Sequence, residues 1–392
     1  MSQDFNPLCP ETFDSPHVEY ERLRSTCPVA HSDAWGGFWA LMKHDDVAAA
    51  AADWRTFITS SQNVVPKVAF TGRRPPLHLD PPEHTPYRRA LAPLLTERQV
   101  ERLRPVIRSI CRNLLAAMVA RGGGDIVADF SAHMPIATFA HWMNLPPKAV
   151  AELTDVGQRY NIAVQSNDME ATKASSLWLY DMARQIVADR RANPLSPDED
   201  ATSALLAARV DGEPLPDDLI VGTIRQVLVV GIIAPSVMIG SIAVHLSRHP
   251  DLQAQLRANP ALVPAAIDEF LRLYTPYRGF ARTAVEDVTI RWRSIPAGEP
   301  IALVYASANR DEDVFEAADT FRLNRPNMKD SVAFGRGPHA CVGAALARLE
   351  LIVALEELLA AAPGFTMTAE PKPTRFPEIG ALSVLVAFEA AA

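Results

Sequence analysis

The sequence predicts a mainly helical protein with small β-sheets, an α+β fold. Apolar residues recur at helical spacing through most of the 392 residues. Strand patterns are confined to short segments, at 37–44, 285–305 and the C-terminal tail. No repeat, low-complexity tract or linker composition divides the chain. We therefore expect residues 1–392 to form a single large domain.

Composition narrows the class of protein. Hydrophobic residues make up 48% and charged residues 21% of the chain, values typical of a globular protein. The net charge of −8 gives no basic footprint for nucleic acid. Four cysteines without a CxxC pair do not make a disulfide scaffold, so we expect a reducing, cytoplasmic compartment. The polar N-terminus predicts neither a signal peptide nor a membrane anchor.

The expected elements follow in chain order. Helices are predicted, from their apolar periodicity, at 17–26, 44–53, 97–121, 146–158, 170–193, 217–249, 251–258, 262–274 and 343–362. The proline-rich segment 61–82 is expected to be a long loop, and the RGGGD run at 121–125 a turn between helices. Residues 285–305 are expected to form strands with a turn at 296–298, and the tail a pair of strands.

One segment is long and apolar enough to cross a membrane. Residues 227–244 (VLVVGIIAPSVMIGSIAV) carry no charge. The helical pattern continues on both sides, which predicts a rod of roughly 45 Å. A helix that is apolar all round also fits the centre of a large soluble domain. We expect this buried central helix rather than a membrane span.

The chemistry concentrates around Cys341, in the string FGRGPHACVG at 334–343. Gly335 and Gly337 permit backbone conformations and close approaches that side chains block. Cys341 precedes a predicted helix, whose N-terminus is expected to lower the pKa of the thiol. Gly343 would let the backbone lie flat against a planar partner. A buried structural cysteine is one alternative; a zinc site with His339 is another, but it lacks further ligands at suitable spacing.

The whole string resembles the haem-binding loop of the cytochrome P450 family, FGxGxHxCxG. Each fixed position is present, at Phe334, Gly335, Gly337, His339, Cys341 and Gly343. The resemblance implies the cytochrome P450 fold, with the haem between a long central helix and the cysteine loop. It also implies that Cys341 is the axial thiolate ligand of a b-type haem (iron protoporphyrin IX). Phe334 would cover the proximal face.

Glu269 and Arg272 resemble the ExxR pair of the same family. Residues at i and i+3 share one face of a helix, where such a pair is usually a weak surface ion pair. The apolar surroundings AAIDEFLRLY favour burial, which demands further partners. The family supplies a second arginine, and Arg325 in FRLNRP matches it. The resemblance implies a scaffolding role for these three residues.

The segment HLDPPEHTPYRR at 78–89 resembles the family's propionate-binding helix. His84 and Arg88 lie at i and i+4 and can meet one anionic group together, although a solvated helix start is the alternative. Arg282 and His339 match two further propionate contacts. Four polar or cationic donors suit two carboxylates.

The central helix departs from the family pattern of a small residue, Gly, any residue, an acid and then Thr. Here Val230 and Gly231 are followed by Ile232, Ile233, Ala234 and Pro235. The catalytic stretch implied by the resemblance is thus Gly231, Ile233, Ala234 and Pro235. Ile233 and Ala234 cannot relay protons, and Ser236 points to another side of the helix.

Pro235 lacks an N–H, so the Gly231 carbonyl loses its helical donor and can hold water. Protons could then come from such water or from a polar group of the substrate; alternatively, the oxidant is peroxide. The proline without an acid–alcohol pair also resembles the branch that O-demethylates methoxy-phenols.

The resemblance implies that four regions line a mostly apolar substrate pocket, which suits a small hydrophobic or aromatic molecule. The lining residues are Val64, Val65, Val68, Phe70, Val230, Ile233, Ala234, Tyr277, Gly279, Phe280, Ile379 and Leu382. Lys67, Arg73, Arg74 and Arg278 lie near them in sequence and could bind a substrate carboxylate. We expect Lys67 and the Arg73–Arg74 pair to lie at the surface instead.

The sequence therefore predicts a soluble haem-thiolate monooxygenase, an iron-dependent oxidoreductase that hydroxylates or oxidatively dealkylates its substrate with O₂. No flavin or iron–sulfur segment is recognisable, so we expect electrons from a separate ferredoxin and ferredoxin reductase. Arg336 and Arg348 could present positive charge to an acidic ferredoxin. The alternatives are an H₂O₂-driven peroxygenase and a non-catalytic haem protein that senses a ligand.

Overall fold

The computed structural model describes residues 3–67, 71–375 and 377–390. Its helices are α1 (Pro10–Asp14), α2 (Pro16–Thr26), α3 (His44–Ala52), α4 (Thr85–Leu91), α5 (Glu97–Val100), α6 (Arg104–Ala120), α7 (Met134–Trp142), α8 (Pro147–Gln165), α9 (Met169–Ala192), α10 (Ala201–Ala207), α11 (Asp217–Val230), α12 (Ile233–Arg248), α13 (Pro250–Ala258), α14 (Val263–Leu273), α15 (Tyr305–Ala308) and α16 (Ala344–Ala361).

The strands are short and belong to several small sheets. They are β1 (Val29–Ser32), β2 (Phe38–Leu41), β3 (Phe57–Ile58), β4 (Gly123–Asp125), β5 (Arg209–Val210), β6 (Glu213–Pro214), β7 (Phe280–Ala284), β8 (Val288–Ile290), β9 (Arg293–Ile295), β10 (Pro300–Leu303), β11 (Phe365–Met367), β12 (Lys372–Pro373), β13 (Ala381–Ser383) and β14 (Leu385–Phe388). The expected α+β class is confirmed.

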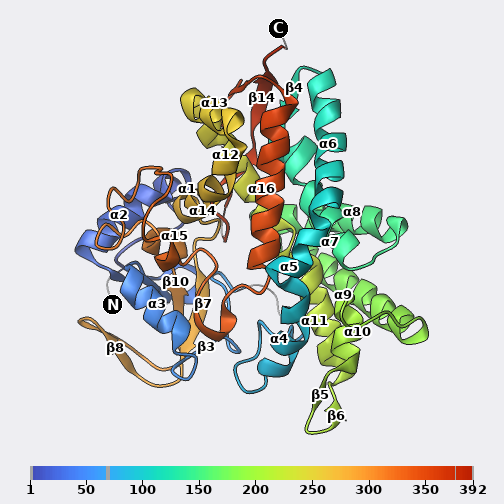
Figure 1. Cartoon of the computed structure of the whole chain (residues 1–392). Helices are drawn as coiled ribbons and strands as arrows, with labels where there is room; N and C mark the ends of the chain where they lie inside the picture. Colours follow the sequence, from blue (N-terminus) through green and yellow to red (C-terminus); the bar gives the residue numbers. More distant parts are fainter. Residues whose placement is uncertain (1–2, 68–70, 376, 391–392) are drawn as a thin grey trace.

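The molecule has a sheet-containing side and a helical side (Figure 1). The largest sheet has the order β1-β2-β10-β7-β3 and is built from N-terminal and late strands. On the other side α6 packs along α16, and α9 packs against both α8 and α11. The main apolar core joins these helices with α12 and α14. Strand β10 is parallel to β2 and antiparallel to β7, with Ile301 opposite both Trp39 and Arg282.

The predicted central helix is broken rather than continuous. Helix α11 ends at Val230, and α12 begins at Ile233 after a two-residue turn at Gly231 and Ile232. Pro235 lies in the first turn of α12, where its missing N–H costs no intrahelical bond of that helix. The combined segment Asp217–Arg248 has the length and hydropathy of a membrane span, yet 67% of its most apolar window is buried inside the protein. A place in the core accounts for this apolar character.

Two other predicted segments differ from the structure. The RGGGD run does not only turn the chain: Gly123–Asp125 form β4, which pairs with β14. A Cβ on Gly123 would lie 2.2 Å from the Val386 carbonyl oxygen, so glycine lets the two strands approach. The tail strand β14 pairs with β11 and β4 rather than with its neighbour β13. Long-range strand pairing of this kind leaves little local signal.

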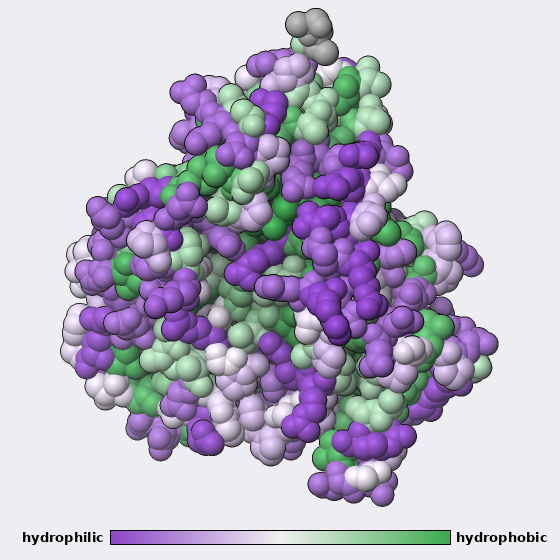
Figure 2. All heavy atoms as spheres, viewed as in Figure 1, coloured by the Kyte–Doolittle hydropathy of each residue, from purple (hydrophilic) through white to green (hydrophobic). Residues whose placement is uncertain are grey.

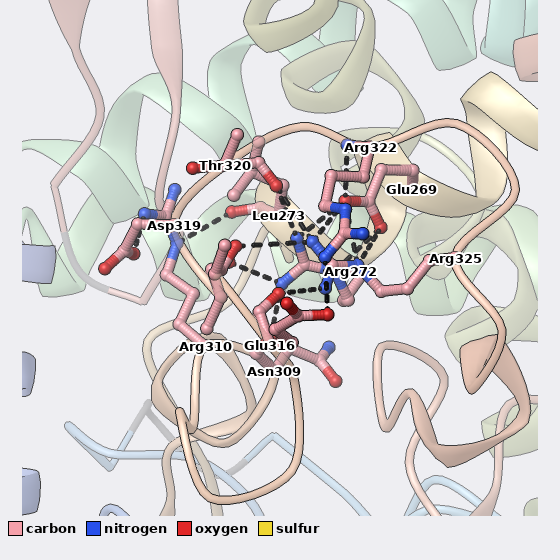
Figure 3. A network of polar contacts seen from close by, with 12 residues as sticks. Glu269, Arg272, Leu273, Asn309, Arg310, Glu316, Asp319, Thr320, Arg322 and Arg325 are labelled. Carbon is pink, nitrogen blue, oxygen red and sulfur yellow. Dashed lines mark hydrogen bonds and ion pairs between the residues drawn. The ribbon is translucent and has the colours of Figure 1, made fainter.

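A buried carboxylate holds the segment that precedes the Cys341 loop (Figure 3). Glu269, on α14, is 1% exposed and accepts hydrogen bonds from Arg272 at 2.7 and 2.8 Å. Arg325 donates to the same carboxylate at 3.1 Å, so the two guanidiniums share one acid. Burial acts to raise the pKa of Glu269, but the two arginines outweigh it and lower that pKa.

The remaining N–H groups of Arg272 and Arg325 donate to backbone carbonyl oxygens of the loop at 309–320. Arg272 Nη1 donates to the Asn309 and Ala318 carbonyl oxygens, each at 2.7 Å. Arg325 Nη2 donates to the Thr320 carbonyl oxygen at 2.9 Å. The Asn309 side chain in turn accepts from Val332 N at 2.8 Å, close to the start of the cysteine loop. The three sequence-predicted residues thus lie together and tie α14 to residues 309–332.

We expect Glu269→Ala to destabilise the protein by about 3–5 kcal/mol, because two buried guanidiniums lose their counter-charge. The free energy of unfolding, from urea denaturation followed by circular dichroism, measures this loss. The matched control is Glu370→Ala, which removes an exposed partner of Arg248 and should change stability little. Equal effects of the two substitutions would contradict the role of the buried carboxylate.

Candidate haem site

The cysteine loop is a short, internally bonded connection into α16. The Cys341 N–H donates to the Phe334 carbonyl oxygen at 2.7 Å, which closes the loop across its base. Gly335 and Gly337 both have positive φ, 70° and 71°. A Cβ on Gly337 would lie 2.7 Å from the Ala51 carbonyl oxygen, so this glycine lets the loop rest on the end of α3. Gly343 is the N-terminal cap residue of α16.

The Cys341 side chain is accessible to solvent although protein surrounds it closely. Its sulfur therefore faces a hollow inside the molecule. The expected lowering of its pKa is wrong for the protein chain alone, because burial raises the pKa of this thiol. The Gly343 N–H, Arg88 and Arg348 act in the opposite direction. These are the groups that favour the thiolate once a cation lies opposite the sulfur.

Phe334 lies beside the loop with a cation over its ring. The Arg348 guanidinium sits 4.8 Å from the ring centroid and forms a 2.8 Å ion pair with Asp268. Arg348 is thus partly compensated, whereas Arg336 donates only to the Asp330 carbonyl oxygen among the contacts of the described residues. Of the two arginines expected at this surface, only Arg348 has its charge compensated by a described carboxylate.

His84 and Arg88 lie beside the loop; His84 is the N-terminal cap residue of α4 and Arg88 belongs to the last turn of that helix. The His84 side chain is buried, and neither of its ring nitrogens has a hydrogen-bond partner among the described residues. Burial, His339 and Arg88 lower the pKa of His84 to about 4, so this imidazole is neutral at pH 7. Its ring centroid lies 4.6 Å from that of His339. Arg88 has no ion pair with any acidic side chain that the structure describes.

His339 is held by a carboxylate. Its Nε2 lies 3.4 Å from Asp80 Oδ1 and 3.3 Å from Thr59 Oγ1. Burial acts to raise the pKa of Asp80, but hydrogen bonds from His339, Thr59 and Ser60 lower it strongly. Asp80 therefore fixes the orientation of His339 from the side of the loop before α4.

Arg282 reaches the same place from β7. It is 4% exposed, donates to the Ala281 carbonyl oxygen at 2.9 Å and bonds to the Tyr305 hydroxyl. Its charge lowers the pKa of His339, which places the two side chains close together. No described carboxylate forms an ion pair with Arg282. The sequence did not single out Tyr305 as its partner.

These residues fit a planar dianionic group that meets one sulfur. Two guanidiniums and a buried imidazole with unsatisfied nitrogens converge beside Cys341. Buried polar groups of this kind require partners, and carboxylates supply them. The two propionates of a haem would do so with Cys341 at the iron. No group of three or more metal-ligating side chains exists in the described part of the chain, so the zinc alternative has no support.

The central helix presents an open face at its break. Val230 is 50% exposed and Gly231 and Ala234 are partly exposed, although their neighbours are buried. Apolar surface is also visible in the recessed centre of the face in Figure 2. A Cβ on Gly231 would lie 2.5 Å from Phe139, so glycine lets α7 pack against the break. Ile233 is buried in the core, and Ser236 bonds to Ser131 at 3.1 Å, away from this face.

The structure brings several of the expected pocket residues together. Val64 bridges to Phe280, whose ring lies 4.7 Å from that of Tyr277. Val65 and Ile379 are buried in one apolar cluster. Gly279 packs against Ala302, and Leu382 is partly exposed on β13. Val68 and Phe70 lie outside the described residues.

Two expectations about arginines are wrong. Arg278 is not poised for a substrate, because it donates to backbone carbonyl oxygens of Glu378, Thr12 and Thr374. Arg74 is 6% exposed rather than a surface residue. The sequence analysis also missed Arg225, which is 1% exposed on α11. The signal was present, since this arginine lies two residues before the uncharged run at 227–244.

Comparison with known proteins identifies the family. The cytochrome P450 family model matches residues 163–378. Cytochrome P450 130 of Mycobacterium tuberculosis is 33% identical over 382 residues, which are 93% of this chain and 92% of that protein. The mycinamicin IV hydroxylase/epoxidase of Micromonospora griseorubida is 32% identical over 363 residues, 89% of this chain and 88% of that enzyme.

Solved structures of cytochrome P450 enzymes also resemble this chain in fold. The structure of cytochrome P450 CYP109Q5 from Chondromyces apiculatus superposes with a TM-score of 0.88 at 28% identity, covering 98% of this chain and 97% of that one. A structure of a mutant of the mixed-function P450 MycG in complex with mycinamicin IV gives 0.85 at 29% identity, covering 96% and 98%. With the cysteine loop and the cationic cluster beside it, these likenesses show that the chain belongs to the cytochrome P450 family and is a haem-dependent monooxygenase.

Proposed function

We propose that this monooxygenase holds a b-type haem by Cys341 and inserts one oxygen atom of O₂ into a small hydrophobic or aromatic molecule. The observation that carries the proposal is the position of three residues beside the accessible sulfur. His84 has no described hydrogen-bond partner, and Arg88 and Arg282 have no described ion-pair partner. When bound, the haem supplies the iron chemistry that activates O₂.

The chain's own residues orient and tune that group. Cys341 supplies the thiolate, and the Gly343 N–H at the start of α16 donates to the sulfur. His84, Arg88, Arg282 and His339 bind the propionates, with Tyr305 holding Arg282 and Asp80 holding His339. Because these residues come from separate elements, they would hold the haem from several sides.

Substrate binds against the open face of the central helix. Val230, Gly231 and Ala234 offer apolar surface there, and Tyr277 and Phe280 approach from the segment after α14. Such a lining excludes water and orients a mostly apolar molecule. Hydroxylation and oxidative dealkylation, including O-demethylation of a methoxy-aromatic, are both compatible with this site.

Electrons come from a separate ferredoxin and ferredoxin reductase, and the protein acts in the cytoplasm as a single haem domain. Arg336, beside the cysteine loop, lacks a described acidic partner and offers positive charge to an acidic ferredoxin.

Proton supply is the distinctive feature of this site. Ala234 occupies the accessible position of the usual alcohol, and Ile233 is buried where the acid is expected. Pro235 cannot donate to the Gly231 carbonyl oxygen, which is free to hold a water at the open face. Water bound there, or a polar group of the substrate, delivers protons in the O₂ reaction.

The missing acid–alcohol pair favours one second function, a peroxide-driven peroxygenase.

We expect Cys341→Ala to abolish thiolate ligation and monooxygenase turnover. The absorption spectrum of the reduced protein treated with carbon monoxide, together with haem content, measures this. Cys111→Ala is the matched control, because it removes a free cysteine that is buried in the apolar core and should keep the thiolate spectrum. An unchanged spectrum in Cys341→Ala would refute the ligand assignment.

We expect Pro235→Ala to lower the product formed per electron consumed, since the new N–H can pair with the Gly231 carbonyl and displace its water. Product and NADH consumption are measured with a surrogate ferredoxin system, and again with H₂O₂ in place of O₂ and electrons. A defect in the O₂ reaction alone supports proton supply at the break.

Ala234→Thr provides the companion measurement for Pro235→Ala. An unchanged product yield per electron in this variant shows that the missing alcohol does not limit the reaction. If Pro235→Ala leaves the yield of the O₂ reaction unchanged, water at Gly231 is not the proton source.

A further inference from the structure

Two arginines are buried together away from the haem-binding cluster. Arg74 comes from the segment before α4 and Arg225 from the middle of α11, and they are 6% and 1% exposed. No acidic side chain that the structure describes forms an ion pair with either one. Isolated buried cations are costly, so such a pair requires an explanation.

Their protein contacts satisfy only part of each guanidinium. Arg225 Nη2 donates to Ser176 Oγ at 2.7 Å, and its guanidinium lies 5.6 and 5.8 Å from the ring centroids of Tyr160 and Tyr180. Arg74 Nη2 lies 3.0 Å from His78 Nε2, and Arg74 also bonds to Tyr160. Nε and Nη1 of Arg225 and Nε of Arg74 are buried without a hydrogen-bond partner among the described residues.

The electrostatics of this cluster favour an anion. Burial and Arg225 lower the pKa of Arg74 to about 10, so Arg74 remains charged at pH 7. Burial, Arg74 and Arg225 lower the pKa of His78 to about 3, so that imidazole is neutral. The tyrosines Tyr160 and Tyr180 are the other titratable groups beside the pair. The cluster therefore carries two positive charges.

The cluster is held in place by close packing of three elements. A Cβ on Gly222 of α11 would lie 2.1 Å from the Arg73 carbonyl oxygen, so glycine lets the Arg74 segment press against the helix. The Tyr180 hydroxyl donates to the same carbonyl oxygen at 3.3 Å. Thr71 and Ser176 hydroxyls are 2.7 Å apart. Two arginines positioned in advance lose little entropy when they bind an anion.

Arg225 of this cluster lies on the same helix, α11, as the exposed residue at the break of the central helix. Val229 lies one turn after Arg225 on the same face of α11, and Val230, half exposed at the break, is about 7.5 Å along the helix from Arg225. Tyr277 is influenced electrostatically by both Cys341 and Tyr160. A molecule whose charged end contacts the arginines can therefore place its apolar body along this face of α11, toward the break.

We propose that Arg74 and Arg225 bind the carboxylate of the substrate, so that this enzyme oxidises small organic acids at a carbon remote from the acid group. The proposal rests on the monooxygenase function proposed above and names its substrate class. Paired guanidiniums match a carboxylate in charge and geometry. The apolar remainder of the acid lies along Val229 and Val230 toward the haem.

The test is a substrate-induced spin-state titration of the purified ferric holoenzyme with matched acids and amides. The probes are 4-ethylbenzoate against 4-ethylbenzamide, and octanoate against octanamide. We expect each acid to bind about 10- to 100-fold more tightly than its amide, as charge-assisted hydrogen bonds predict. Equal affinities within a pair would overturn the proposal.

Substitutions locate the effect. Arg225→Gln and Arg74→Gln should each weaken binding of the acids about 10-fold or more and change amide binding little. Arg225→Lys keeps the charge without the planar fork and should retain an intermediate affinity, which preserves the test if Arg225→Gln does not load haem. Arg73→Gln is the matched control: it removes the same charge from the exposed neighbour and should leave acid binding unchanged. Equal loss in Arg73→Gln would overturn the assignment.

Inorganic anions separate a substrate site from a general anion site. Chloride or phosphate that fully displaces the acid preference at millimolar concentration, or raises the melting temperature as much as the acids do, would overturn the substrate assignment. Neutral aromatic compounds that shift the spin state and turn over while the acids do not bind would refute this inference and leave the monooxygenase function intact. A wild-type protein without a thiolate-haem spectrum would instead refute the proposed function itself.

Discussion

The cysteine loop depends on one buried carboxylate shared by two arginines. Glu269 neutralises Arg272 and Arg325, and their remaining donors capture backbone carbonyls of the loop at 309–320. The Asn309 side chain accepts a hydrogen bond from the Val332 N–H, two residues before the cysteine loop. The backbone of the loop at 309–320 is not held by a helix or sheet along most of its length. Charge-assisted hydrogen bonds from Arg272 and Arg325 to its carbonyl oxygens hold it instead. The position of the Cys341 sulfur follows from this arrangement.

Positive charge without a described acidic partner is buried inside this acidic protein. The chain has a net charge of −8, yet Arg88, Arg282, Arg74 and Arg225 have no described acidic partner. Two of these belong to the propionate site and two to the site we assign to a substrate carboxylate. Burial of each pair has a desolvation cost, which an anionic ligand offsets. The same physical argument thus accounts for cofactor binding and for the proposed substrate class.

The break in the central helix connects packing with chemistry. Gly231 lets Phe139 approach where a side chain would collide, and Pro235, in the first turn of α12, cannot donate to the Gly231 carbonyl oxygen. The result is a short open face of Val230, Gly231 and Ala234 in an otherwise buried segment. An alcohol and an acid are absent from that face, so proton supply rests on backbone, water or substrate.

The sequence by itself determined the helical class, the cysteine loop, the ExxR pair with Arg325 and the cationic cluster beside Cys341, because these depend on local periodicity and on fixed residue types at fixed spacing. It also indicated, through Pro235, where the central helix is disturbed. Only the tertiary structure decided that Gly123–Asp125 pair with β14, that Arg278 serves backbone carbonyls, and that Arg74 lies buried against Arg225. These facts depend on contacts between residues far apart in the chain, and burial decides whether an arginine is a solvated surface charge or a binding group.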